Sequence, residues 1–533
     1  MHRSRTYFLF LLVGLLVFMP LFTSVAQAAP ADPLADGVFT IGMEVNYAPF
    51  NWSQSTDKNG AVPVSNSPGE YATGYDVWLA KKLCEKLGVK LEIVKTEWDG
   101  LPPALESGKI DGILAGMSPT AERRKTIDFT DYYYKSDLVM VVRKDGPYAK
   151  AKSLEDFAGA KITGQLNTFH YEVIDQIPNV KKQTALADFP TMITSLSAGK
   201  IDGYVSESPG AMAAVVANPS LAYTVFDEGK GFKFTPDDIS IAIGLAKGCP
   251  ARERINEGLS EIPEEERGEA MGKYIELSTV DDGNETEVKK NGFFDDVKKI
   301  WSDYSSLFWR GMAITLLISI VGTAIGFVIG LLVQLIRTIP SGDTYPGGRN
   351  FIVHLLYAIC TIYVEVFRGT PMMVQAMLIY YGSKMFFNID MNAMFAAFLI
   401  VSINTGAYLA ETIRGGMDSV SEGQLEAAKA IGLSHTQTIF DVVLPQAIRA
   451  ILPSIGNELI VNVKDTSVLN VISVTELFFL TKGVAGSTLK TFQAYFIAAV
   501  IYLVLTLILS RLLKILSGRF NPDKPFELTS ATN

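Results

Sequence analysis

The stretch "EAAKAIGLSHTQTIFDVVLP", residues 426–445, is polar and favours helix, yet it stands between long apolar segments. Residues 422–431 have the composition of a short helix, and Gly432 suits the left-handed turn that ends one. Ser434 and Gln437 have the spacing of a capping box, which starts a second helix. The closing Leu-Pro pair ends that helix or starts the next, because proline is tolerated in the first turn of a helix. The stretch therefore predicts two short helices joined by a tight turn.

The apolar segments around this stretch predict five membrane crossings. A crossing needs about 20 predominantly apolar residues. The first segment also carries three glycines at four-residue spacing, Gly322, Gly326 and Gly330, which lets a neighbouring helix approach closely. The predicted crossings are residues 312–336, 369–386, 392–409, 451–479 and 492–510.

Charge places the two ends of this block on opposite sides of the membrane. Basic residues follow the last crossing and indicate a cytoplasmic C-terminus, because positive charges are retained on that side. Five crossings then put the start of the first one outside and residues 411–445 in the cytoplasm. Lys482 and Lys490 fall on the outer side and weaken this argument. The basic residues after the last crossing are Arg511, Lys514, Arg519 and Lys524.

The N-terminus predicts export of the residues that follow it. A basic start is followed by an uncharged run over residues 7–19, and Ala26-Gln27-Ala28 has the form of a cleavage site. Residues 1–28 therefore have the pattern of a secretory signal peptide. An uncleaved anchor helix is the alternative, because residues 7–25 are nearly long enough to span a bilayer. Both versions place the soluble half outside, in agreement with the charge argument.

Residues 36–278 alternate short apolar strands with amphipathic helices. This order predicts an α/β domain with mainly parallel sheets covered by helices. The recurring words "SGKIDG" and "AGKIDG" indicate two lobes of similar build. Two extended segments, residues 138–143 and 239–245, are expected to join the lobes, and two crossings of this kind make a hinge around a cleft.

Residues 279–308 are predicted to join the two halves. The polar segment "STVDDGNETEVKKNG" has no periodic pattern of apolar residues, which is typical of a linker. Residues 293–308 carry apolar side chains near one side, which predicts an amphipathic helix on the outer membrane surface. Direct continuation into the first crossing is the alternative. Residues 309–518 then form the membrane domain, and residues 519–533 a cytoplasmic tail.

Several polar side chains fall within or beside crossings three and four. Such residues usually face the interior of a bundle or an aqueous path, and pairing for structure alone is the alternative. They are Asn404, Glu411, Asn457, Glu458, Lys464 and Asp465.

The opening stretch resembles the EAA loop of ABC importer permeases. It departs from the pattern at Val442, where isoleucine is commoner. "VEVFRGTPMMVQ", "SINTGAYLAETIRGG" and "NELIVNVKDTS" further resemble the polar amino acid branch. The resemblance implies an all-α permease of a type I importer, whose loop 421–445 docks into a separate ATPase subunit. The residues implied in this coupling are Glu426, Ala427, Ala428, Gly432, Leu444 and Pro445.

The exported half resembles the extracellular solute-binding proteins for polar amino acids. "YAPFNW", "GYDVWLAKKL", "EWDGLPPALESGKIDGILAGMSPTAERRKTIDFTDYYY" and "KIDGYVSESPGA" occur in the order found in that family. The resemblance covers residues 38–276. It implies a bilobed type II periplasmic-binding-protein fold that captures a free amino acid.

Burying the ligand carboxylate requires charged and backbone donors, since desolvation is otherwise not offset. Arg123 offers a planar fork that can hold a carboxylate through two bonds, and the resemblance places it there. Gly116-Met117-Ser118 precedes it, with a close backbone approach at the glycine and a hydroxyl at the serine. The Ser-Pro-Thr within this motif is expected to open a helix whose N-terminus favours anions. Arg124 is expected to be a solvated surface charge.

The ligand ammonium needs an anion, and Glu207 stands where the family usually has aspartate. In the same lobe Thr168 is expected to meet the carboxylate. Asn167 replaces the usual glycine before it, which leaves the backbone geometry there open.

Aromatic residues in the matched motifs are expected to wall the ligand's stem: Tyr47, Phe50 and Trp98. Glu44 can reach the ligand side chain. An anionic pocket prefers arginine or lysine and repels glutamate, while glutamine remains compatible because a carboxylate accepts from an amide.

Composition excludes some classes of function. The net charge of −9 argues against nucleic acid as a partner. No G-x-x-x-x-G-K-[ST] loop occurs, and the three cysteines and four histidines form no metal pattern, so no cofactor is expected. We expect a plasma-membrane transport subunit rather than an enzyme, contacting lipid, paired with a second copy of itself and driven by a separate ATPase dimer. A ligand-gated channel and a membrane-anchored amino acid sensor are the alternatives.

Overall fold

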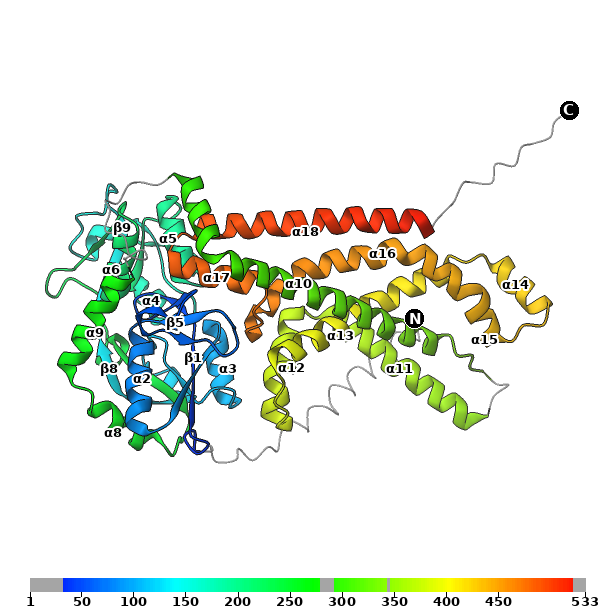
Figure 1. Ribbon diagram of the computed structural model, residues 1–533, viewed down its shortest axis with the longest axis horizontal. Helices are drawn as coiled ribbons and strands as arrows, with labels where there is room; N and C mark the ends of the chain where they lie inside the picture. Colours follow the sequence, from blue (N-terminus) through cyan, green and yellow to red (C-terminus); the bar gives the residue numbers. More distant parts are fainter. Residues whose placement is uncertain (1–31, 279–291, 343–345, 521–533) are drawn as a thin grey trace.

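The computed structural model describes residues 32–278, 292–342 and 346–520. The α/β half and the helical half lie end to end along the long axis of the molecule (Figure 1). This confirms the predicted order of a bilobed α/β domain followed by an all-α membrane domain. The predicted signal peptide, residues 279–291 of the linker and most of the C-terminal tail lie outside the described residues.

The first lobe is built on a five-stranded sheet in the order β6-β1-β7-β14-β8. β1 pairs in parallel with β6 and β7, and β14 runs antiparallel to β7 and β8. A smaller sheet has the order β2-β3-β5-β4. The strands are β1 Val38–Met43, β2 Asn46–Tyr47, β3 Asn51–Gln54, β4 Val62–Pro63, β5 Tyr71–Thr73, β6 Lys90–Lys95, β7 Gly112–Ile113, β8 Ile127–Lys135 and β14 Ser240–Ala246. The helices of this lobe are α2 Tyr75–Leu87, α3 Leu101–Glu106, α8 Arg252–Ser260 and α9 Glu264–Leu277.

The second lobe repeats this plan with the strand order β11-β10-β12-β9-β13. β10 is parallel to β11 and β12, while β9 is antiparallel to β12 and β13. Its strands are β9 Leu138–Arg143, β10 Lys161–Thr163, β11 Lys181–Lys182, β12 Gly203–Glu207 and β13 Leu221–Thr224. Its helices are α4 Phe169–Glu172, α5 Phe189–Ser197, α6 Ser208–Ala217 and α7 Pro236–Ile239.

The chain passes between the lobes twice, just before β9 and just before β14. The two predicted joining segments are therefore these strands, one in each lobe. Each strand enters its sheet antiparallel to its neighbours, so both sheets are mixed rather than mainly parallel. The two crossings allow the lobes to hinge about the cleft between them.

Helix α2 illustrates how local sequence makes these elements. Val77, Ala80 and Leu83 recur at helical spacing and are buried, because they form the face that packs on the core. The helix ends at Gly88, whose φ of 68° gives the left-handed cap that glycine adopts without a steric penalty.

Among the described residues of the membrane half, five helices are long and apolar enough to cross a bilayer: Phe293–Arg337, Gly347–Gly369, Ala393–Asp418, His435–Ile472 and Thr491–Ile515. Short helices join them. The elements are α10 Phe293–Arg337, α11 Gly347–Gly369, α12 Met372–Phe387, α13 Ala393–Asp418, α14 Glu422–Ala430, α15 His435–Gln437, the π-helix η7 Thr438–Val443, α16 Leu444–Asp465, the 3-10 helix η8 Thr466–Ile472, α17 Leu477–Thr488 and α18 Thr491–Phe520.

The predicted separate interfacial helix at residues 293–308 is wrong. These residues are the first turns of the 45-residue α10, which continues into the first span. Ile300, Leu307 and Phe308 pack against α17 and α18 residues such as Leu477, whereas Phe294 and Trp301 stay exposed.

The position of the second crossing also needs correction. The prediction took residues 369–386, whereas the span is α11, Gly347–Gly369. A break at Thr370-Pro371 separates it from α12, whose 16 residues are about 24 Å long and shorter than the hydrocarbon core. The charged side chains near both ends of α11 hid it from the sequence. The number of crossings is unchanged.

The small-residue face of the first span is confirmed as a close helix contact. A methyl group added at Gly326 would lie 2.9 Å from Cβ of Thr405, and one at Gly330 would lie 2.8 Å from the backbone nitrogen of Ala410. Both partners are on α13, so the glycines allow α10 and α13 to pack backbone to backbone.

Candidate functional site

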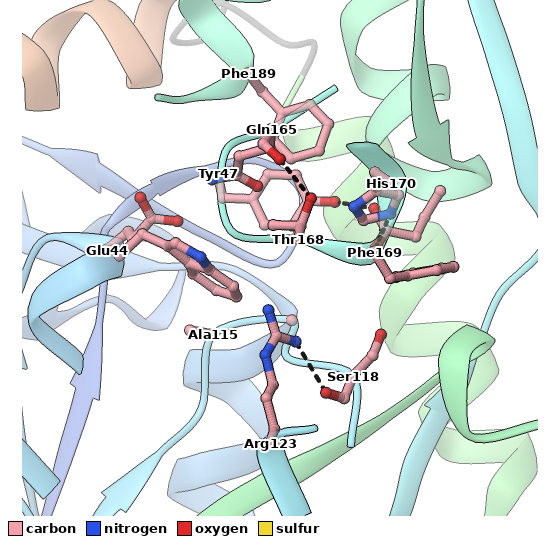
Figure 2. Close-up of a pocket in the computed structure, with 13 residues that line it drawn as sticks. Glu44, Tyr47, Ala115, Ser118, Arg123, Gln165, Thr168, Phe169, His170 and Phe189 are labelled. Carbon is pink, nitrogen blue, oxygen red and sulfur yellow. Dashed lines mark hydrogen bonds and ion pairs between the residues drawn. The ribbon is translucent and has the colours of Figure 1, made fainter. Parts of the chain in front are cut away.

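A cavity with an empty volume of about 310 Å³ lies between the two lobes. Figure 2 shows Arg123 reaching into the space between Glu44 and His170. The cavity is lined by Glu44, Tyr47, Trp98, Ala115, Gly116, Ser118, Arg123, Gln165, Thr168, Phe169, His170, Phe189 and Glu207.

Eight of the ten residues proposed from the sequence line this cavity. The other two, Phe50 and Met117, are buried next to it. The ring of Phe50 stacks on that of Tyr47 with centroids 5.2 Å apart, so Phe50 supports the wall instead of forming it.

Arg123 is held in place by backbone oxygens and one ring. Its guanidinium donates to the carbonyl of Ser118 at 2.9 Å and to that of Asn167 at 3.2 Å, and it lies over the Trp98 ring at 5.0 Å. Burial lowers the pKa of Arg123 to about 10, which still leaves the group charged at neutral pH. Because Asn167 belongs to the second lobe, this cation touches both walls of the cleft.

The expected helix after Ser118 is absent from this part of the described chain. Residues 118–122 are not helical, and the chain then makes the three-residue 3-10 turn η4, Arg123–Lys125. β8 starts at Ile127, two residues after this turn. Arg124 instead pairs with Asp237 at 3.1 Å and is partly exposed.

The structure shows which backbone conformation Asn167 takes at the position where the family usually has glycine. Its φ is 56°, in the left-handed region that asparagine visits more readily than most residues. Its side chain donates to Asp99 of the first lobe at 2.8 Å. Thr168 donates its hydroxyl to the carbonyl of Gln165 at 2.7 Å.

Glu207 is buried and engaged by two side chains. It accepts a hydrogen bond from the Tyr47 hydroxyl at 2.5 Å, and its other oxygen lies 2.8 Å from Nε2 of His170. Burial alone would raise the pKa of Glu207, but His170 and Tyr47 together bring it below the ordinary value. The second lobe therefore presents a carboxylate to the cavity.

Glu44 is the second acidic group of the cavity and is 5% exposed. Burial, with a further contribution from Glu97, raises the pKa of Glu44 to about 8, and Lys482 opposes the shift. An empty cavity at neutral pH thus holds this carboxyl mainly protonated. A cation next to it would favour the ionised form.

Phe189 faces Tyr47 across the lobes, with ring centroids 4.6 Å apart and nearly parallel planes. Both rings also line a second hollow of about 260 Å³, which is bordered by Leu489 of the membrane half. The stacked pair therefore stands between the cavity and a space that the membrane half helps to enclose.

Sequence reasoning missed five lining residues. Phe169 and His170 directly follow the pair Asn167-Thr168, and Gln165 lies two residues before it. Ala115 precedes Gly116, while Phe189 starts α5 and carries no signal that separates it from a core aromatic.

The loop of residues 421–445, which contains α14 and α15, lies at the end of the molecule opposite the α/β half (Figure 1). α14 confirms the first predicted short helix, Gly432 has a φ of 85° in the turn, and the capping box of Ser434 with Gln437 starts the second helix. The second helix is longer than predicted, because it continues through η7 and α16 as one apolar helix over His435–Ile472. Leu444 and Pro445 begin α16.

Some side chains of this loop are exposed and others are buried against the rest of the chain. Glu426 and Ala427 are exposed, whereas Ala428 is buried against its own chain and is not free to enter a partner's groove. Two large apolar side chains are exposed instead, Ile431 at 78% and Phe440 at 50%.

Two protein families match the chain. Residues 39–276 match the bacterial extracellular solute-binding proteins, family 3, and residues 348–522 match the binding-protein-dependent transport system inner membrane component.

Individual relatives match each half. The chain is 38% identical over 225 residues to the glutamine transport system permease protein GlnP of Escherichia coli (strain K12), covering 42% of this chain and 97% of that protein. It is 34% identical over 201 residues to the arginine transport system permease protein ArtQ of Bacillus subtilis (strain 168), covering 38% of this chain and 86% of that protein. A solved amino acid ABC transporter substrate-binding protein from Streptococcus pneumoniae, bound to L-arginine, is 25% identical with a TM-score of 0.40 and covers 46% of this chain and 96% of that chain.

Proposed function

Because the chain belongs to the family of binding-protein-dependent transport system inner membrane components and carries an amino acid receptor in the same polypeptide, we propose that it captures a polar amino acid outside the cell and delivers it through its own permease. The main support for this proposal is the cavity between the lobes, which is lined by the cation of Arg123 and the carboxyl groups of Glu44 and Glu207. The stacked Tyr47 and Phe189, next to the hollow that Leu489 borders, support release toward the membrane half.

The charges of the cavity are complementary to a free amino acid. Arg123 binds the ligand carboxylate through its guanidinium fork, with Ser118, Gly116 and Thr168 alongside. Glu207 balances the ammonium, because a buried cation needs an anion within reach.

Glu44 sets the preference for the ligand side chain. A cationic amino acid such as arginine or lysine pairs with the ionised carboxylate, and glutamine donates its amide to it. The similarity to permeases named for glutamine and for arginine supports this class of substrate.

A thermal-shift screen of the full chain against the twenty amino acids tests this function. A ligand that binds the native state raises the unfolding temperature in proportion to RT ln(1 + [L]/Kd). We expect stabilisation by arginine, lysine or glutamine and none by glutamate. Stabilisation by none of the twenty, or by acidic amino acids alone, contradicts the proposal.

A separate ATPase dimer is proposed to drive the transport through the loop of α14 and α15. The exposed Glu426, Ala427, Ile431 and Phe440 give this loop a mixed polar and apolar surface, as protein–protein interfaces have. The given sequence contains no P-loop, which supports a nucleotide site on another polypeptide.

A second copy of the chain is proposed to complete the pore. α16 carries Asn457, Lys464 and Asp465 exposed within the span His435–Ile472, and Glu458 partly so. Polar side chains at this depth do not face lipid, so they border an aqueous path or a partner subunit. Light scattering of the solubilised chain should give two copies; a strictly monomeric chain in an active complex contradicts this point.

A further inference from the structure

One lysine of the membrane half touches a carboxylate from each lobe. Lys482 of α17 forms an ion pair with Glu97 of the first lobe, and its Nζ lies 3.6 Å from Oδ2 of Asp188 in the second lobe. All three side chains are nearly buried. Glu97 directly precedes Trp98 and Asp188 directly precedes Phe189, both of which line the ligand cavity. The contact thus lies where the two cavity walls meet the membrane half.

The first lobe is fastened to the membrane half at further places. Lys109 pairs with Asp390 at 2.8 Å, and Arg310 donates to the backbone oxygen of Pro68. A methyl group at Gly486 of α17 would lie 2.5 Å from Cβ of Asn46, so the two backbones pack directly. These contacts do not depend on the second lobe.

A buried ion pair reinforces the same attachment. Lys95 and Glu70 lie 2.5 Å apart, are 2% and 1% exposed, and pack against Gly483 of α17. The Lys95 ammonium also lies 4.8 Å from the ring centroid of Phe479.

The second lobe has a smaller attachment. Within the described ranges, its hydrogen bonds and ion pairs to the membrane half come from the start of α5. These are the Asp188–Lys482 pair and a hydrogen bond from the Thr491 hydroxyl to the carbonyl of Pro190 at 3.0 Å. If the lobes open about their two crossings while the first lobe stays fastened, Asp188 leaves Lys482 and Glu97 does not.

The helix that carries Lys482 is itself fixed. Glu476 caps α17 by accepting from the backbone N–H of Phe479 at 2.7 Å, and it also accepts from the Tyr502 hydroxyl at 3.1 Å. The lysine therefore projects from a rigid support.

We propose that Lys482 is the positioning residue through which the permease recognises the closed receptor. Glu97 holds the ammonium in both states, and Asp188 completes the contact when the lobes close. The inference rests on the proposed function, in which ligand binding closes the lobes. Since ligand and Lys482 both favour the closed state, each strengthens the effect of the other.

The affinity of the full chain for amino acids tests whether Lys482 is coupled to ligand binding. The Kd for L-arginine and for L-glutamine is measured by calorimetry on the wild type and on Lys482→Ala, Lys482→Arg and Lys490→Ala. Lys490 is the matched control, because it lies close by and pairs with Asp296 of α10 rather than with a lobe. We expect about tenfold weaker binding for Lys482→Ala, within the usual range of coupling between two sites, with recovery in Lys482→Arg and no change in Lys490→Ala.

A distance measurement gives a readout that needs no ligand identity. Spin labels at Glu85→Cys and Glu155→Cys, both exposed and on different lobes, report the opening of the cleft in the full chain. The native cysteines Cys84, Cys249 and Cys360 are buried. Lys482→Ala should shift the distances toward longer values, and Lys490→Ala should not.

Asp188→Asn serves as a second variant if Lys482→Ala does not fold. Asparagine keeps the cap that Asp188 provides to the backbone of Thr191, but it removes the charge. It should reproduce the longer distances. Identical distances in wild type, Lys482→Ala and Asp188→Asn overturn the inference. A wild type that binds no amino acid overturns the proposed function instead, and the distances still decide the role of Lys482.

Discussion

A proton should leave the receptor when it binds a cationic amino acid, because of Glu44. The carboxyl of Glu44 is buried between the lobes with Glu97 close by, which raises its pKa from 4.5 to about 8. A guanidinium or ammonium placed next to it opposes both effects by attraction and favours the carboxylate. Binding therefore has to release the proton that the empty site holds.

The size of the release follows from the pKa. At pH 7 a group with a pKa near 8 is about nine-tenths protonated, at pH 8 about half, and at pH 9 about one-tenth. We expect about 0.9 protons released per bound arginine or lysine at pH 7, falling to about 0.1 at pH 9. Glutamine is uncharged in its side chain and should release much less.

Calorimetry of the full chain in buffers with different ionisation enthalpies measures this number directly. Glu44→Gln keeps the size of the side chain, removes the ionisable group and should abolish the release. Binding of a cationic ligand at pH 7 without proton release refutes the reasoning, as does a release that persists in Glu44→Gln.

The same carboxyl affects stability with a definite sign. Below pH 4.5 Glu44 is protonated in the folded and the unfolded chain, and its contribution does not depend on pH. Between pH 4.5 and about 8 the unfolded state releases a proton that the folded state retains, so stability falls as pH rises. The unfolding temperature of the ligand-free receptor should therefore fall less steeply in Glu44→Gln over this range.

Three further changes test separate parts of the molecule. Arg123→Ala should abolish amino acid binding in calorimetry, because the ligand carboxylate loses its cation, while Arg124→Ala should bind normally; equal loss in both would point to misfolding. Glu426→Ala should lower ATP-driven uptake in vesicles at least tenfold with ligand affinity unchanged, and undiminished uptake counts against the docking role. Gly326→Leu should reduce the yield of folded protein in size-exclusion chromatography, because the leucine side chain would overlap α13. Gly348→Leu is the control, since Gly348 has open space around it and the variant should be tolerated. Equal yields of the two variants would disprove the close packing.

The sequence predicted elements whose pattern is local. The capping box at Ser434, the turn at Gly432 and the glycine face around Gly326 all depend on residues a few positions apart. The second span was misplaced, because the charged residues Arg349 and Arg368 near the ends of α11 shortened its uncharged stretch.

The candidate site was predictable where a residue belonged to a quoted motif. Tyr47, Trp98 and Arg123 line the cavity as expected. His170 was not found, because its partner Glu207 is distant in the chain and the pair forms when strand β12 and helix α4 come together. The contacts of Lys482 were equally hidden, since they join residues hundreds of positions apart.

Uptake of labelled amino acid into proteoliposomes is the measurement closest to the central claim. The full chain is reconstituted with and without an ATP-binding ABC subunit, and labelled arginine or glutamine is offered on the receptor side. Accumulation against a gradient that requires both ATP and the second subunit is the predicted result. Flux down the gradient through the chain alone, unaffected by nucleotide, would show a channel and contradict the account.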